Sequence, residues 1–262
     1  MAGRSFKDEQ ICFPRVRVAY QEKLGVIKTF FDQQKASFPP TGIYMRVIKA
    51  EGLLELWTQS EPNDPYLKVR EYEICAHSGG LGPKRREGDM QVPEGFYKIN
   101  CFNPASRFHL ALGLDYPNLS DGFFSDQNSP GGDIFIHGSC LSIGCLAMTD
   151  SYIKELYIAA VEARNMGQGQ IPVHIFPAHM DSSGMEWLQQ ALLSGSGPYA
   201  AMVQEPGGED QRSELLRFWR NLQEGYESFV RTGMPPVVAI DSEGAYTFTV
   251  PAAEEEPQGI SY

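Results

Sequence analysis

The sequence has no hydrophobic run long enough to cross a bilayer, and it is poor in basic residues. A membrane-spanning helix needs about 20 consecutive apolar residues, so we expect a soluble chain with no membrane span. Lysine and arginine number 22 against 33 acidic residues, which gives a formal net charge of −11. Because a phosphate backbone is attracted by a positive field, this charge argues against nucleic acid as a partner.

Cysteine is also scarce, with five residues at irregular positions, namely 12, 75, 101, 140 and 145. An odd number of cysteines in a chain too long to need covalent staples is not the pattern of a disulfide-rich fold. We therefore predict no disulfide framework and at least one free thiol. Cys75 and Cys101 fall in strand-like segments, and we expect both in the core.

The apolar content, 42%, is sufficient for one large core or for a core with an appended subdomain. Residues 14–36 have one apolar helical face, which Pro39 and Pro40 end. From Ile43 to His137, short β-branched and aromatic runs alternate with glycine and proline, which predicts strands joined by turns. These runs are IYMRVIK, LLELWTQ, LKVREYEICA, EGFYKINCF, RFHLALGL and GDIFIHG.

Other segments predict loops and further helices. SGGLGPKRREGD and NLSDGFFSDQNSPGGD carry the turn residues of long surface loops. After Met148, Thr149 or Ser151 can cap a helix that packs on the strand-rich block, and IPVHIFP follows as one more strand. MEWLQQALLSG and SELLRFWRNLQEGYESFVRTG have the periodicity of amphipathic helices.

The segment IFIHGSCLSIGCLAMTD, residues 134–150, places one histidine and two cysteines close together. A structural zinc site typically needs about four ligands in paired short spacings, but only His137, Cys140 and Cys145 occur here. A Cys140–Cys145 disulfide would need two side chains that converge across a very short loop. Two buried thiols without chemistry, and a nucleophile with its base, are the remaining interpretations.

Two glycines favour the nucleophile. Gly144 lets a substrate approach the Cys145 sulfur, and Gly138 places the His137 imidazole at the exit of a strand. A free thiol has a pKa of ~8.5, and an imidazole that accepts its proton raises the thiolate fraction. The backbone N–H groups of Gly144 and Cys145 are candidate donors to the oxyanion of a tetrahedral intermediate.

These residues resemble a known family. Ile136-His137-Gly138 followed by Ser-x-Gly-Cys, residues 142–145, is similar to the signature of the L,D-transpeptidase (YkuD-type) catalytic domain, and GSCLSIGCLAMTD resembles its YafK/ErfK-like branch. GPKRREGDMQVPEGFYKI, SRFHLALGLDYPN and VRTGMPPVV also resemble segments of the family. The similarity covers roughly residues 43–177.

The resemblance implies a fold and a division of the chain. The fold class is α+β, mainly a β-sandwich catalytic domain with flanking N- and C-terminal helices. The expected parts are an N-terminal helical extension at 1–41, the catalytic domain at 42–178 and a C-terminal helical extension at 179–262. No cofactor and no metal are implied.

The resemblance also implies roles for the motif residues. Cys145 is the expected nucleophile and His137 the general base, and the backbone carbonyl of Ile143 is expected to orient His137. Ser142 and Gly144 are expected to shape the oxyanion pocket.

One departure concerns substrate binding. Many members follow the cysteine with a hydrophobic residue and an arginine, whereas Leu146 and Ala147 stand here. Without that guanidinium, the carboxylate anchor of the donor must come from elsewhere. The candidate substrate-binding residues are Lys84, Arg85, Arg107, His109, Tyr116 and His77. Against these assignments, Lys84 and Arg85 could be solvated loop charges, and His109 a structural histidine within a strand. Asn118 is interpreted as a turn former, and His174 and His179 as structural.

The function implied by the resemblance is a peptidoglycan-modifying cysteine acyltransferase that acts through a thioester on the diamino acid of a stem peptide. Its partners would be peptidoglycan stem peptides, with a wall-attached protein as a further candidate. One alternative is an amidase or hydrolase that uses water at the same site, and another is a non-catalytic wall-binding module. Because the substrate lies outside the cytoplasm and MAGRSFKDEQICFPR lacks the apolar region of an export signal, we expect a periplasmic or envelope location and an export segment before residue 1.

Overall fold

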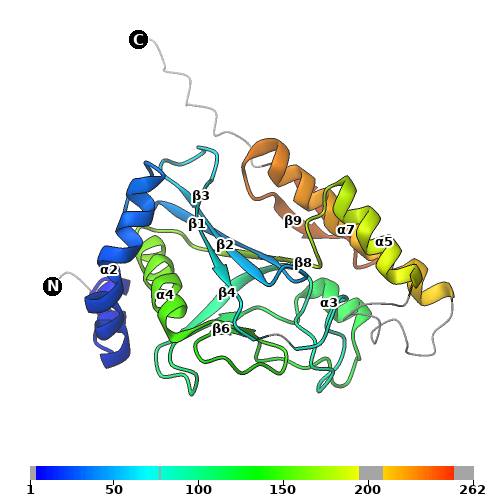
Figure 1. Ribbon diagram of the computed structural model, residues 1–262, viewed down its shortest axis with the longest axis horizontal. Coiled ribbons are helices and arrows are strands. Elements are labelled where there is room, and N and C mark those ends of the chain that lie inside the picture. The colour runs from blue at the N-terminus through cyan, green and yellow to red at the C-terminus, as the bar shows by residue number, and fades with distance from the viewer. Residues whose placement is uncertain (1–3, 77, 195–208, 251–262) are drawn as a thin grey trace, which may run out of the picture.

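The computed structural model describes residues 4–76, 78–194 and 209–250 (Figure 1). The described helices are α1 (Phe6–Ile11), α2 (Pro14–Gln33), α3 (Leu119–Phe124), α4 (Asp150–Asn165), α5 (Ser182–Ser194) and α7 (Glu209–Thr232). The strands are β1 (Gly42–Ile48), β2 (Leu53–Gln59), β3 (Leu67–Glu73), β4 (Gly95–Asn103), β5 (Ala111–Leu114), β6 (Phe135–His137), β7 (Leu146–Ala147), β8 (Pro172–Phe176), β9 (Val237–Ile240) and β10 (Tyr246–Thr249).

The strands β1 to β8 form one sheet in the order β3-β2-β1-β8-β4-β5-β6-β7. Most neighbours are antiparallel, but β1 with β8 and β6 with β7 run parallel. Strand β4 belongs to both halves, because residues 95–98 pair with β8 and residues from Ile99 onward pair with β5 across a register shift. The sheet curls at β4, so the two layers of the predicted β-sandwich are two halves of one curled sheet. The predicted α+β class with a strand-rich centre is confirmed.

The two edges of this curled sheet meet beside the predicted motif. Ala76, just after β3, forms an antiparallel bridge with Ala147 of β7. The N–H of Cys75 donates to the carbonyl of Ala147 at 2.9 Å. The residues after β3 therefore close the sheet against β7.

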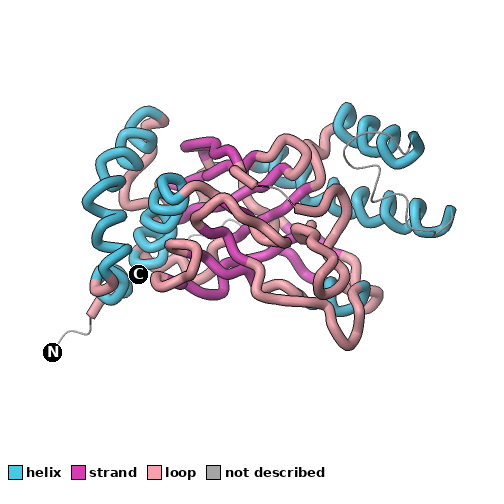
Figure 2. The backbone as a smooth tube through the Cα atoms, turned by 60° about the horizontal axis from the view of Figure 1, so that its bottom comes forward, coloured by secondary structure: helices cyan, strands magenta, loops and turns pink. Residues whose placement is uncertain are grey.

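Helices cover the sheet on two sides, with the strands between them (Figures 1 and 2). Buried side chains of α2 and α4, such as Ile27, Phe31 and Leu156, join those of the sheet in one hydrophobic cluster. A second cluster joins α5, α7 and β10 to the sheet through residues that include Trp219 and Phe176. The division at 41 and 178 remains a prediction, since both flanking parts share a core with the sheet.

Several local predictions are confirmed. The helix predicted over 14–36 is α2, and Thr149 caps α4 by accepting a hydrogen bond from the Tyr152 N–H at 3.1 Å. Asn118 does more than form a turn, because it caps α3 in a reciprocal pair with Asp121. Helix α3 itself lies inside a segment predicted to be a surface loop.

Other local predictions are wrong. The strand predicted from Arg107 begins only at Ala111, because residues 104–110 form a turn in which His109 has φ 71°. Cys101 lies in β4 as expected, but it is exposed instead of buried in the core.

Among the helices that the structure describes, none has both the length and the apolar character of a membrane span.

Candidate active site

Strands β6 and β7 bring the two predicted catalytic residues to one face of the sheet. Their parallel register pairs Ile136 with Leu146 and His137 with Ala147. Ile136 and Leu146 point into the core. Because side chains alternate along a strand, His137 points to the opposite face, and Cys145, directly before β7, joins it there. Both residues line one groove of about 1120 Å³.

The His137 imidazole is held by a carbonyl and by an aromatic ring. Its Nδ1 lies 2.6 Å from the carbonyl oxygen of Gly138, so Nδ1 carries the proton and Nε2 is left as an acceptor. The ring of Phe108 stacks on it with centroids 4.7 Å apart and an interplanar angle of 30°. The prediction that the Ile143 carbonyl orients His137 is therefore wrong, because Gly138 supplies that acceptor and Ile143 is 79% exposed on the groove.

Burial sets the protonation of both groups. It lowers the pKa of His137, against a smaller rise from the Gly138 carbonyl. Burial also raises the pKa of the Cys145 thiol, and the charge of Asp133 adds to the rise, while a hydrogen bond from the Phe135 backbone and the charge of Lys84 oppose it. The half-buried thiol lies 3.6 Å from the Asp133 carbonyl and is placed to donate to it. The resting site thus favours a neutral thiol and a neutral imidazole over the expected thiolate and imidazolium.

Ser142 organises the turn that precedes Cys145. Its hydroxyl donates to the Cys145 carbonyl at 2.7 Å and accepts from the Gly144 N–H at 3.2 Å. The Ser78 hydroxyl lies 3.0 Å from it on the other side. The Gly144 N–H is therefore engaged inside the turn, and its predicted part in the oxyanion pocket stays a prediction. Gly144 is still required, because its φ of 130° favours glycine.

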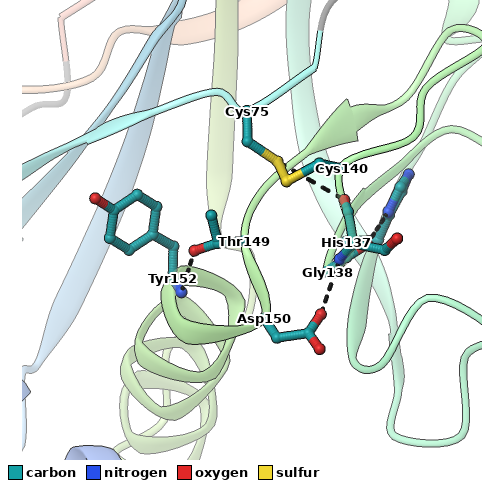
Figure 3. Close-up of a disulfide and its surroundings, with 8 residues drawn as sticks. Cys75, His137, Gly138, Cys140, Thr149, Asp150 and Tyr152 are labelled. Atoms are coloured by element: carbon teal, nitrogen blue, oxygen red, sulfur yellow. Dashed lines mark hydrogen bonds between the residues drawn. A yellow bond between two sulfur atoms is a disulfide. The ribbon is translucent and has the colours of Figure 1, made fainter.

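A disulfide fixes the loop between the two catalytic candidates. Cys75, beyond the end of β3, is bonded to Cys140, with Cα atoms 5.4 Å apart (Figure 3). Ser139, which precedes Cys140, donates its N–H to the carboxylate of Asp150 at the start of α4, at 2.9 Å. The expectation of Cys75 as a plain core residue is therefore wrong. So is the alternative Cys140–Cys145 bridge, and Cys145 remains a free thiol.

The predicted substrate-binding residues separate into two groups. Lys84 and Arg107 line the groove with Cys145. Lys84 is not a solvated loop charge, because it is 4% exposed and its ammonium pairs with Asp89 at 2.7 Å. Arg107 is exposed and forms no hydrogen bond or ion pair within the described part of the chain.

The other candidates that the structure describes do not line the groove. Arg85 pairs with Asp121 at 3.5 Å and borders a separate cavity of about 530 Å³ near α3 and α7. The Tyr116 hydroxyl is committed to the Pro130 carbonyl at 2.9 Å. His109 lies in the turn after β4, where its Nδ1 is buried without a partner. His77 falls outside the described residues.

Three groups at the site were not foreseen, namely the Phe108 ring and the carbonyls of Asp133 and Gly138. The Gly138 carbonyl had a signal, since a glycine follows the histidine directly, but nothing in the sequence pointed to the other two. His174 is buried, as a structural histidine should be. The described residues contain no group of histidine, cysteine and carboxylate side chains that could hold a metal ion.

Comparison with known proteins agrees with the motif. The family model for the YkuD L,D-transpeptidase catalytic domain matches residues 43–175. The protein named "Putative L,D-transpeptidase YafK" in Escherichia coli (strain K12) is 32% identical over 218 residues, which is 82% of this chain and 77% of that protein. Its namesake in Escherichia coli O157:H7 matches equally.

Two solved structures are more distantly similar. The helical cell shape determining protein Pgp2 from Campylobacter jejuni is 18% identical with a TM-score of 0.40, over 82% of this chain and 80% of that one. Bdellovibrio bacteriovorus Bd1075 is 18% identical with a TM-score of 0.39, over 78% of this chain and 79% of its own. The sequence match and the family model together extend well beyond the motif, and the chain belongs to the L,D-transpeptidase family with a YkuD-type catalytic domain.

Proposed function

We propose that this chain is a cysteine acyltransferase of the bacterial cell wall, with Cys145 as nucleophile and His137 as general base. The observation that carries the proposal is their common groove, which opens beside the paired strands β6 and β7. Family membership supports peptidoglycan stem peptides as the substrate class and the periplasm or cell envelope as the location.

Because the thiol and the imidazole are both neutral at rest, the thiol proton is transferred to His137 while the Cys145 sulfur attacks the substrate. Nε2 of His137 takes the Cys145 proton as the sulfur attacks the carbonyl carbon on the L-centre of the stem's diamino acid. The bond from that carbon to the nitrogen of the terminal D-residue breaks, and the imidazolium gives its proton to the departing amine. A thioester on Cys145 remains. An acceptor amine then attacks the thioester, its proton passes to His137, and the sulfur leaves and recovers a proton.

The backbone supplies a donor for the oxyanion. The N–H of Cys145 lies outside the β6–β7 ladder and has no hydrogen-bond partner within the described part of the chain, whereas the Gly144 N–H is bound to Ser142. A donor adjacent to the nucleophile is well placed for charge that develops on the attacked carbonyl.

Arg107 is the groove's candidate for the missing carboxylate anchor. Its guanidinium is exposed and lacks a partner among the described residues, whereas the Lys84 ammonium is already neutralised by Asp89. A guanidinium that binds a carboxylate in two-pronged fashion gives both affinity and orientation.

The proposal is tested by incubating purified protein with muropeptides that carry tetrapeptide stems, with and without an added D-amino acid, and identifying products by mass spectrometry. We expect release of the terminal D-residue and a new amide bond to the added amine. Cys145→Ala and His137→Gln should abolish turnover. Cys12→Ser, which alters an exposed free cysteine, is the matched control and should act like the wild type.

The products also decide among the alternatives. Release of the D-residue with only water added would identify a hydrolase or amidase that uses the same site. A folded wild-type protein that neither turns over muropeptides nor forms a Cys145 adduct would overturn the proposal and favour a wall-binding module.

A further inference from the structure

A residue outside the matched catalytic domain reaches the loop beside the imidazole. Arg15, in the first turn of α2, precedes the region 43–175 that matches the family. Its Nη1 donates to the carbonyl of His109 at 2.7 Å and also to the carbonyl of Ser106. One guanidinium therefore connects the N-terminal helix to both ends of the turn that contains Phe108.

That turn has a conformation that needs support. His109 is a non-glycine residue with φ 71°, a left-handed conformation that costs roughly 1–2 kcal/mol. Inside the turn, the Phe108 N–H donates to the Ser106 hydroxyl at 3.0 Å. The carbonyls of Ser106 and His109 converge on Arg15 only while this bend is kept. The hydrogen bonds of Arg15 thus stabilise the strained turn from outside.

The turn packs against the His137 imidazole and against Gly138, whose carbonyl orients that imidazole. The Phe108 ring stacks on His137. A Cβ on Gly138 would lie 2.8 Å from the Phe108 carbonyl oxygen and 2.9 Å from the His109 Cβ. The turn therefore packs directly against the Gly138 backbone, whose N–H also donates to the Leu110 carbonyl at 3.1 Å. The Gly138 carbonyl in turn holds Nδ1 of His137.

We propose that Arg15 is a positioning residue, which holds the 104–110 turn so that Phe108 fixes and dehydrates the catalytic imidazole. The role of His137 as base rests on the proposed function, whereas its placement by Arg15 can be measured without turnover. The N-terminal helix is thereby part of the catalytic apparatus, although the family match begins after it.

The dehydration has a measurable consequence. The ionisable groups nearest His137 are Cys145 next to β7, His109 on the turn, and Asp150 at the start of α4, whose carboxylate would lie 2.7 Å from a Cβ on Gly138. The groove that His137 lines also contains Arg107, Lys84, Glu87 and Asp133. Burial lowers the pKa of His137, and the hydrogen bond to the Gly138 carbonyl raises it by less. Release of the turn admits water, so the pKa of His137 should move up toward its ordinary value.

The test compares Arg15→Met with Arg17→Met. Arg17 is an exposed arginine of the same helix without a side-chain hydrogen bond to a described residue, so its variant removes the same charge. The His137 ring is titrated by NMR, with its signal assigned from its absence in His137→Gln. Phe108→Ala removes the stacking ring directly, and Arg15→Lys restores an N–H donor.

We expect His137 to titrate at higher pH in Arg15→Met and in Phe108→Ala than in the wild type. Arg17→Met should match the wild type, and Arg15→Lys should lie close to it. In turnover, Arg15→Met should lower kcat about tenfold with little change in KM, since a displaced base impairs the reacting geometry.

The inference is overturned if Arg15→Met folds and His137 titrates as it does in Arg17→Met. Should Arg15→Met fail to fold, Phe108→Ala still decides whether the turn sets the titration, and Arg15→Lys whether a donor at this position suffices. Loss of the proposed function would appear separately, as absent turnover in the wild type with an unchanged titration difference.

Discussion

Cys75 and Cys140 are separated by 65 positions and form a disulfide at the place where the two edges of the curled sheet meet. One cysteine follows β3, and the other lies in the loop between His137 and Cys145. The bond therefore closes the sheet and anchors the loop between His137 and Cys145 with a single covalent link.

The first prediction concerns that link. A disulfide that closes a loop of this length lowers the entropy of the unfolded chain, by a contribution of about 4 kcal/mol in the simple loop model. We expect the double variant Cys75→Ser/Cys140→Ser to lose a comparable part of its unfolding free energy in urea. Cys12→Ser, which changes an exposed thiol, should unfold like the wild type. If the double variant and the wild type had equal unfolding free energies, the disulfide would not stabilise the fold through the entropy of the unfolded chain.

The second prediction concerns the pH dependence of turnover. His137 must be neutral to accept the thiol proton, and burial holds its pKa below the ordinary value. Activity should therefore rise as His137 loses its proton, with kcat/KM reaching its plateau by neutral pH. Burial also raises the pKa of Cys145, so its thiolate forms only in the alkaline range.

Alkylation separates this scheme from a preformed ion pair. Iodoacetamide should react with Cys145 at pH 7 no faster than with the exposed Cys12, and its rate should increase toward alkaline pH. Much faster labelling of Cys145 near pH 6 would instead indicate a resting thiolate and imidazolium.

The sequence predicted the long regular elements and pointed to His137 and Cys145, which line one groove in the structure, and the reasons are local. The Thr149 cap and the apolar periodicity after it specify α4 without reference to the rest of the chain. The glycine next to each of His137 and Cys145 marks a backbone that opens to substrate. Strand β7 has only two residues, Leu146 and Ala147, which is too short for a sequence periodicity. It is defined by its pairing with β6.

What could not be predicted depends on distant contacts. Cysteine pairing is not specified by spacing, so Cys75 gave no indication of Cys140. Lys84 stands in a glycine- and proline-rich segment typical of solvated loops, yet Asp89 pairs with it below the surface. His109 alternates with apolar neighbours as in a strand, but the turn held by Arg15 overrides that pattern.

The third prediction tests Arg107 as a carboxylate anchor. A charge-assisted hydrogen bond contributes about 1.5–3 kcal/mol, and exposure reduces that value. Arg107→Gln should therefore raise KM about tenfold for a donor with a free carboxylate on its diamino acid, and the effect should shrink at high salt. Steady-state kinetics with the free and the amidated donor measure this.

Amidation supplies the control, because it removes the carboxylate instead of the guanidinium. Wild type and Arg107→Gln should have similar KM for the amidated donor. An equal loss for both donors would mean that Arg107 acts by another route.

The fourth prediction concerns Ser142, whose hydroxyl connects the Cys145 carbonyl, the Gly144 N–H and Ser78. Ser142→Ala removes all three contacts and leaves the turn before the nucleophile less constrained, so kcat should fall about tenfold while KM changes little. Ser78→Ala removes one contact of the three and should have a smaller effect, and Ser142→Thr keeps the hydroxyl and should recover most of the activity. The same substitution to alanine frees the Gly144 N–H. If the site needs the Gly144 N–H as a second oxyanion donor, Ser142→Ala should instead increase kcat. That result would contradict the prediction, because the Ser142 hydroxyl would then slow catalysis by occupying the Gly144 N–H.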